Sequence, residues 1–191
     1  ISPRDWSSDV CSSDLAQLVI RVHPGELKTH GTSMVEVIEQ AFPALPEHIH
    51  LVRPEDKTNT YDLVETADFG IVYTTTVGLE MAMSGLPVAV TGLTHYAEKG
   101  FTLDPADWQD FESILSRLAA DPASMRLSQQ QVEQAWLYAY LFFFEFSLPF
   151  PWHLLWLHED FEARPMRFVL SPEGQEKYAQ TFGYLAGEPL D

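Results

Sequence analysis

Short apolar runs alternate with amphipathic stretches along the first half of the chain. Four runs rich in β-branched residues predict strands, and three stretches with apolar residues at helical spacing predict the helices between them. The predicted strands cover 17–22, 48–52, 69–73 and 87–90, and the predicted helices cover 34–42, 60–67 and 75–84. Because helices alternate with strands, we expect an α/β fold with a doubly wound parallel sheet.

The second half of the chain has a helical pattern that weakens toward its end. Helices are predicted over 105–118 and 124–146, and the stretch after Phe161 is weakly patterned. A chain of 191 residues can bury one substantial core. We therefore predict an α/β domain at 16–104, C-terminal helices packing on it at 105–160, and a weakly patterned tail at 161–191.

The first fifteen residues follow neither pattern. They are rich in Ser and Asp, they lack the basic start and apolar run of a secretory signal, and 5–15 resembles a translated sequencing adapter. The alternative is a flexible native N-terminus. We predict that 1–15 is non-native, so Cys11 carries no functional information.

Aromatic residues concentrate between Trp136 and Trp156. This segment also contains Glu145, Pro149 and Pro151, and its uninterrupted apolar run is far shorter than the roughly 20 residues needed to span a bilayer. We expect the aromatic helix at 136–146 to pack against another domain or to rest on a membrane surface.

Charge and cysteine content narrow the classes of partner. The chain has 28 acidic and 11 basic residues and a formal net charge of −17, whereas nucleic acid is bound by clustered Lys and Arg. Nucleic acid is therefore excluded as an expected partner. The single cysteine excludes a disulfide framework, and the histidines outside the candidate site lack the spacing of a metal site. The expected setting is reducing and cytoplasmic.

Candidate ligand-binding residues follow the predicted strands, because ligands bind at the carboxyl ends of parallel strands. Thr75, Thr76 and Gly78 lie between the third strand and the next helix, where unpaired amides and two hydroxyls can hold a phosphate. The alternative is that one threonine only caps the helix. Glu80 can accept hydrogen bonds from two ribose hydroxyls, or can merely interact with the helix dipole.

Two further pairs stand in predicted loops. His23-Pro24 follows the first strand, and the His23 imidazole can donate a hydrogen bond or a proton to a leaving phosphate, which makes His23 the catalytic candidate. His95-Tyr96 can stack on, or bond to, a base or a sugar. The alternatives are a surface histidine and a packed loop aromatic. We interpret Glu26 as a solvated loop residue rather than a companion carboxylate.

Taken in order, these motifs resemble the capsule polysaccharide biosynthesis family of bacterial glycosyltransferases over about 23–104, with threonines where serines are common. The motifs are His23-Pro24, Tyr61-Asp62-Leu63, Ala67-Asp68, Thr75-Thr76-Val77-Gly78-Leu79-Glu80, Gly85-Leu86-Pro87-Val88, Gly92, His95-Tyr96 and Lys99-Gly100-Phe101-Thr102.

The resemblance implies a GT-B architecture, in which two Rossmann-like domains face a cleft and the C-terminal one, supplied by this chain, binds the donor. The implied donor is a nucleotide-sugar, CMP-linked rather than UDP-linked, such as activated 3-deoxy-manno-octulosonic acid, with neither a metal nor another cofactor. His23 would contact the donor phosphate, Thr75 and Thr76 would cradle it, and Glu80 would face the ribose.

The catalytic base and the contacts to a glycan or glycolipid acceptor would belong to a missing N-terminal domain. We therefore expect the chain alone to be inactive. Its expected location is the cytoplasm, with peripheral association at the inner membrane as a variant of that expectation.

Three alternatives remain. An enzyme similar to nucleotide-sugar 2-epimerases would share the two-domain fold and a glutamate on the corresponding helix, but would use a UDP-sugar. The second alternative is a binding module without catalysis. The third, a doubly wound signalling domain, ranks last because no acidic cluster follows the first predicted strand.

Overall fold

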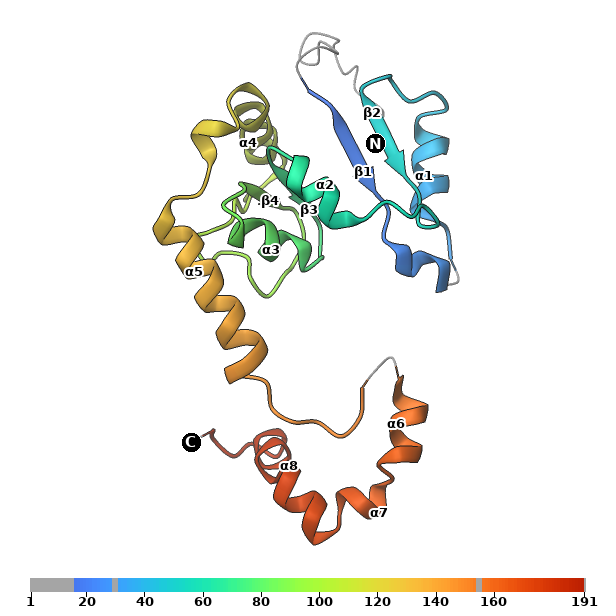
Figure 1. Ribbon diagram of the computed structural model, residues 1–191, viewed down its shortest axis with the longest axis vertical. Coiled ribbons are helices and arrows are strands. Elements are labelled where there is room, and N and C mark those ends of the chain that lie inside the picture. Colours follow the sequence, from blue (N-terminus) through green and yellow to red (C-terminus); the bar gives the residue numbers. More distant parts are fainter. Residues whose placement is uncertain (1–15, 29–30, 154–155, 191) are drawn as a thin grey trace. The chain divides into compact units, whose positions relative to one another are not determined.

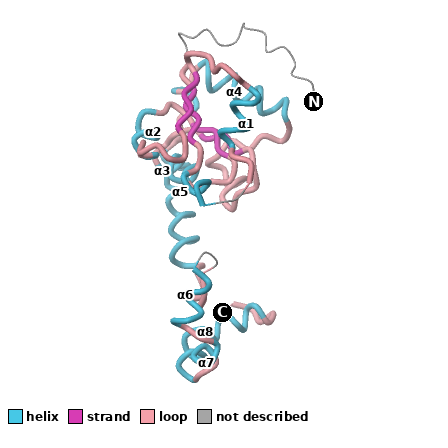
Figure 2. The backbone as a smooth tube through the Cα atoms, turned by 90° about the vertical axis from the view of Figure 1, so that its right-hand side faces the viewer, coloured by secondary structure: helices cyan, strands magenta, loops and turns pink. Residues whose placement is uncertain are grey.

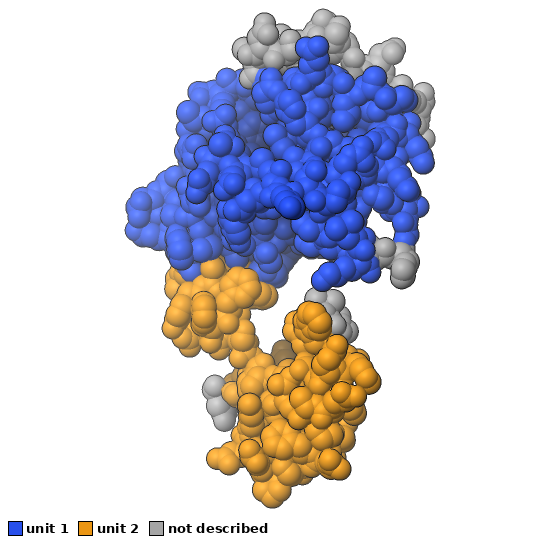
Figure 3. All heavy atoms as spheres, turned by 45° about the vertical axis from the view of Figure 1, so that its right-hand side comes forward, with its two compact units in different colours: residues 1–136 blue, residues 137–191 orange. Residues whose placement is uncertain are grey.

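The computed structural model describes residues 16–28, 31–153 and 156–190. The chain divides into two compact units, unit 1 at Ile1–Trp136 and unit 2 at Leu137–Asp191 (Figure 3). The predicted non-native segment 1–15, with Cys11, lies outside the described residues. Within the described residues, strands occur in unit 1 alone and unit 2 is built from helices and loops (Figure 2).

Unit 1 alternates strands and helices in the predicted order (Figure 1). The strands are β1 Leu18–Arg21, β2 Ile49–Val52, β3 Gly70–Val72 and β4 Val88–Val90. The helices are α1 Met34–Ala41, α2 Thr60–Thr66, α3 Val77–Met83, α4 Trp108–Ala120 and α5 Gln129–Tyr140, which crosses into unit 2. The predicted mixed α/β class is therefore confirmed.

The four strands form two separate parallel pairs rather than one continuous sheet. β1 pairs with β2, with Leu18 opposite Ile49, and β3 pairs with β4, with Gly70 opposite Val88. No ladder joins β1 to β3 among the described residues. The described residues therefore show two small parallel pairs, and the predicted doubly wound sheet is not shown.

The core of unit 1 lies around β4. All three residues of β4 are buried, which is typical of an inner strand covered on both faces. On one side β4 pairs with β3, and on the other Ala89 forms a parallel bridge with Leu103. Helix α3 packs on β3 and β4, and α4 packs on β4, where Ile114 and Leu118 close a buried cluster with Ala89.

The structure corrects the helices predicted at 105–118 and 124–146. Helix α4 begins only at Trp108, because the Asp107 carboxylate caps it by accepting from the Asp110 amide at 2.8 Å. The second predicted helix is broken after a 3₁₀ turn at Ala123–Met125. Helix α5 then starts anew after Ser128, whose amide and hydroxyl both donate to Gln131 Oε1 at 3.0 Å. This pairing is the capping box of a new helix.

The end of α5 carries exposed aromatic side chains. A π-helical turn, Leu141–Glu145, follows α5 directly. Trp136, Tyr140 and Phe144 recur every four residues, and each is more than half exposed. In the described part of the chain, no helix combines the length and apolar character needed to cross a bilayer.

The tail predicted to be weakly patterned is helical. It contains α6 Leu157–Ala163, α7 Met166–Val169 and α8 Pro172–Leu185. Helix α8 begins where the Ser171 hydroxyl accepts from the Gly174 amide at 3.2 Å and Pro172 occupies the first turn. Gly174 packs so closely on α7 that an added Cβ would lie 2.2 Å from the Phe168 carbonyl oxygen.

Candidate functional site

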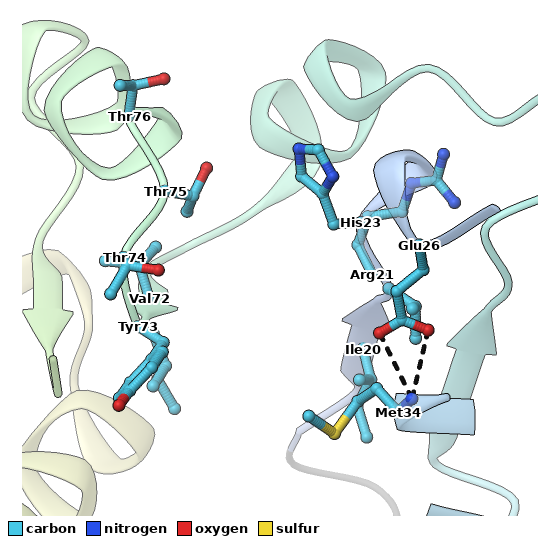
Figure 4. Close-up of a pocket in the computed structure, with 12 residues that line it drawn as sticks. Ile20, Arg21, His23, Glu26, Met34, Val72, Tyr73, Thr74, Thr75 and Thr76 are labelled. Carbon is cyan, nitrogen blue, oxygen red and sulfur yellow. Dashed lines mark hydrogen bonds between the residues drawn. The ribbon is translucent and has the colours of Figure 1, made fainter. Parts of the chain in front are cut away.

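A pocket of about 640 Å³ opens at the carboxyl ends of β1 and β3 within unit 1 (Figure 4). One wall comes from β1, the turn after it and the start of α1, and the other comes from β3 and the segment leading to α3. The lining residues are Ile20, Arg21, Val22, His23, Glu26 and Met34 on the first wall, and Ile71, Val72, Tyr73, Thr74, Thr75 and Thr76 on the second. The structure therefore brings three predicted site residues, His23, Thr75 and Thr76, into one pocket.

The His23 imidazole is oriented by the backbone that follows it. Pro24 begins a 3₁₀ turn, Pro24–Lys28, and the Gly25 amide donates to His23 Nδ1 at 2.9 Å. Because Nδ1 accepts this bond, the neutral ring carries its proton on Nε2, which can act as a hydrogen-bond donor. Pro24 does not line the pocket, so its contribution is to shape the turn that holds His23.

Glu26 is a structural link rather than the solvated loop residue that we predicted. Its carboxylate accepts from the Ser33 hydroxyl at 2.8 Å and from the Met34 amide at 3.1 Å, as the dashed lines to Met34 in Figure 4 mark. Ser33 in turn caps α1 by accepting from the Val35 amide at 3.1 Å. The carboxylate thereby ties the pocket wall after β1 to the first turn of α1.

The two candidate threonines have different surroundings. The Thr75 hydroxyl accepts from the Val77 amide at 3.3 Å, so it supports the start of α3. Thr76 occupies the cap position of α3, but its hydroxyl makes no capping hydrogen bond. The Thr76 hydroxyl therefore does not stabilise the start of α3, and Thr76 lines the pocket.

Tyr96 lies behind the threonine segment and does not line the pocket. Its side chain is only 1% exposed, and its hydroxyl donates to the Thr75 carbonyl. Gly78 makes room for it, because a Cβ added at Gly78 would lie 2.4 Å from the Tyr96 hydroxyl oxygen. Tyr96 and Gly78 thus position Thr75, whereas the sequence suggested that Tyr96 would contact a base or a sugar. Burial raises the pKa of the Tyr96 phenol.

His95 is exposed and also does not line the pocket. Its ring meets the Tyr96 ring edge-on, with the ring centroids 5.2 Å apart. Partial burial lowers the pKa of His95. Tyr96 is therefore a packed loop aromatic, and His95 is an exposed ring that rests against it.

Glu80 projects from α3 toward α2, and it does not line the pocket. The exposed Tyr61 phenol is hydrogen-bonded to the Glu80 carboxylate, and this bond raises the pKa of the phenol. The negative charge of the carboxylate raises the same pKa by a smaller amount. A ribose that reached Glu80 would therefore compete with Tyr61 for the carboxylate.

Sequence reasoning missed Arg21 and Tyr73 as pocket residues. Arg21 is a cation inside an apolar strand, and its guanidinium donates to the carbonyls of Arg53 and Asp56 beside β2. Tyr73 is a large aromatic that is 70% exposed directly after β3. A charged residue within an apolar run, and an aromatic at a strand end, are the signals that could have identified them.

Within residues 16–28, 31–153 and 156–190, no group of three or more His, Cys, Asp or Glu side chains is arranged to hold a metal ion. Comparisons with family models, curated proteins and solved structures found no match to the chain. The pocket and the order of the motifs are therefore the features of the chain that point to a function.

Proposed function

We propose that the pocket binds the phosphate of a nucleotide-sugar, and that the chain is the donor-binding part of a bacterial surface-polysaccharide glycosyltransferase. The observation that carries this proposal is the convergence of His23, Thr75 and Thr76 on one pocket from the carboxyl ends of β1 and β3. These residues come from separate motifs of the family that the sequence resembles. Imidazole and hydroxyl donors are suited to phosphate oxygens.

The proposal also includes the arrangement of the four strands of unit 1 in one doubly wound sheet. With β1 beside β3, the strand order would be β2-β1-β3-β4, and the segments that carry His23, Thr75 and Thr76 would lie where the chain changes direction along the sheet. Ligands bind at this position in doubly wound folds. The Leu18 and Val22 amides donate to the β2 side, so the Val19 and Arg21 amides face the other edge. We expect those two amides to be protected from hydrogen exchange, and rapid exchange would refute a continuous sheet.

The proposed donor is CMP-linked, and the sugar is 3-deoxy-manno-octulosonic acid or a related acid. His23 would donate from Nε2 to a phosphate oxygen, and the Thr75 and Thr76 hydroxyls would donate to the same group. The Glu80 carboxylate would give up its hydrogen bond with Tyr61 and accept hydrogen bonds from the ribose hydroxyls instead. Transfer to a glycan or glycolipid would require a partner domain, so the chain alone would bind donor without turnover, in the cytoplasm or at the inner membrane surface.

Calorimetric titration of the chain with CMP, UDP and GDP tests the proposal. The sharpest variant is Thr76→Val, because it removes a hydroxyl that α3 does not use and keeps the side-chain shape. Losing one hydrogen bond to a charged phosphate should weaken CMP binding by roughly tenfold to a hundredfold. The matched control is Thr58→Ala, at an exposed position outside the pocket.

Each outcome of this titration separates the candidate functions. CMP binding that Thr76→Val weakens and Thr58→Ala leaves unchanged supports the transferase proposal. A preference for UDP would instead favour the 2-epimerase-like alternative. A folded chain that binds none of the three nucleotides would refute the proposal and leave the binding module without catalysis.

A further inference from the structure

The two ends of the pocket differ in chemistry. His23, Thr75 and Thr76 lie at one end and carry hydrogen-bond donors. Ile20, Met34 and Tyr73 lie at the other, beside the Glu26 carboxylate that is bonded to Ser33 and Met34 (Figure 4). A ligand that fills both ends must therefore carry a polar or anionic group on one side and an apolar or planar group on the other. A nucleotide has this division, with its phosphate and its base at opposite ends.

Tyr73 is held as a flat, open surface at the apolar end. The residue directly follows β3, and its side chain is 70% exposed although it is a large aromatic. One edge of the ring rests on Gly92, where an added Cβ would lie 2.7 Å from Tyr73 Cδ2 and 2.9 Å from Cε2. Gly92 therefore leaves the space that the ring occupies, and the rest of the ring remains accessible from the pocket.

Hydrogen bonds and close packing hold the backbone beside Tyr73. The Thr91 amide donates to the Val72 carbonyl at 2.8 Å, and the Thr91 hydroxyl donates to the same carbonyl at 3.1 Å. A Cβ at Gly92 would also lie 2.5 Å from the Tyr73 carbonyl oxygen, so the two strand ends are in close contact. Because Thr75 follows two residues later on the same wall, the ring and the hydroxyls are presented together.

We infer that Tyr73 is the binding residue that stacks on the planar base of the bound nucleotide. This inference rests on the proposed function and extends it, since it assigns the base end of the ligand to a residue that none of the motifs contains. Aromatic rings stack on the flat face of a nucleobase. Because every base has such a face, stacking stabilises all of the bases and discriminates little between them. Tyr73 would therefore contribute affinity for a base, while the preference among bases would come from other contacts.

The test compares two ligands that share a ribose phosphate and differ in the base. CMP and ribose 5-phosphate are titrated into the wild-type chain and into the Tyr73→Leu and Tyr73→Phe variants. Tyr73→Leu should weaken CMP binding by about tenfold and Tyr73→Phe should keep it within about twofold, because the phenyl ring still stacks. Ribose 5-phosphate binding should be the same for all three proteins. The matched control is Tyr184→Leu, at a tyrosine of unit 2 that is 53% exposed.

The failure of this assignment and the failure of the proposed function give different results. If CMP binds and Tyr73→Leu leaves its affinity unchanged, Tyr73 is not the stacking residue and the donor site stands. The same conclusion follows if the wild-type chain binds ribose 5-phosphate as tightly as CMP. If the folded wild-type chain binds neither compound, both the donor site and the role of Tyr73 are refuted.

Discussion

Replacing Gly78 with alanine tests the packing that places Thr75 in the pocket. The new Cβ would lie 2.4 Å from the Tyr96 hydroxyl oxygen and 2.8 Å from Val72 Cγ2, so either the ring or the helix must move. Overpacking of this kind costs about 1–3 kcal/mol, and losing the hydrogen bond to the Thr75 carbonyl costs about 1 kcal/mol. Better helix propensity returns about 1 kcal/mol.

The expected net effect is a loss of about 2 kcal/mol in the free energy of unfolding. In urea unfolding this should lower the transition midpoint by roughly 1 M. The matched control is Gly31→Ala, because a Cβ added at Gly31 meets nothing within 4 Å. A Gly78→Ala protein as stable as the wild type would refute the packing argument.

A double variant identifies the group responsible. Tyr96→Phe removes the oxygen that the new Cβ would meet first, so Gly78→Ala should cost less in the Tyr96→Phe background than in the wild type. Residues in contact give such non-additive effects, whereas independent sites give additive ones. Additive costs would mean that the Tyr96 hydroxyl is not what excludes a side chain at position 78.

Three further predictions concern the pocket, unit 2 and pH. Gly25→Ala would place a Cβ 2.7 Å from His23 Nδ1, so calorimetry should record weaker CMP binding with stability nearly unchanged; unchanged affinity would contradict the assigned orientation of His23. Gly174→Ala would place a Cβ 2.2 Å and 2.5 Å from two carbonyl oxygens of α7, and urea unfolding should record a loss of about 3 kcal/mol, since backbone cannot yield as a side chain does. Burial raises the pKa of Tyr96 above its ordinary value of 10.0, so its contribution to stability is complete below about pH 10 and is lost as pH rises toward the folded-state pKa. Stability measured from about pH 9 to 11 should therefore fall less steeply for Tyr96→Phe than for the wild type, and equal slopes would contradict this.

The elements of unit 1 could be predicted because their signals are local. β-branched runs and apolar spacing depend on neighbouring residues alone, and they placed every strand and α-helix of 16–90 within two residues of its ends, whereas the 3₁₀ turn Pro24–Lys28 was not predicted. Pairing depends on residues distant in sequence, so the separation of β1–β2 from β3–β4 could not be derived in this way. Ser128 with Gln131, and Ser171 before Pro172, were local signals for α5 and α8 that could have been recognised.

The candidate site was predictable in position but not in detail. His23, Thr75 and Thr76 met in one pocket because each follows a strand. Tyr96 faces inward because Gly78 leaves space for it, and the Glu26 carboxylate, on the 3₁₀ turn after β1, accepts from the Met34 amide. Both contacts depend on tertiary packing, which residue type and spacing do not encode.

The two pocket walls belong to different strand pairs, so a ligand that touches both would act as a non-covalent staple. By mass action, a ligand at 100 times its dissociation constant adds about 2.7 kcal/mol to the free energy of unfolding. At equal concentration, a compound that fits only one wall would bind more weakly, so it would raise the melting temperature less than a compound that contacts both walls. A thermal-shift screen of phosphorylated compounds would therefore identify ligands of this pocket without an assay for any reaction.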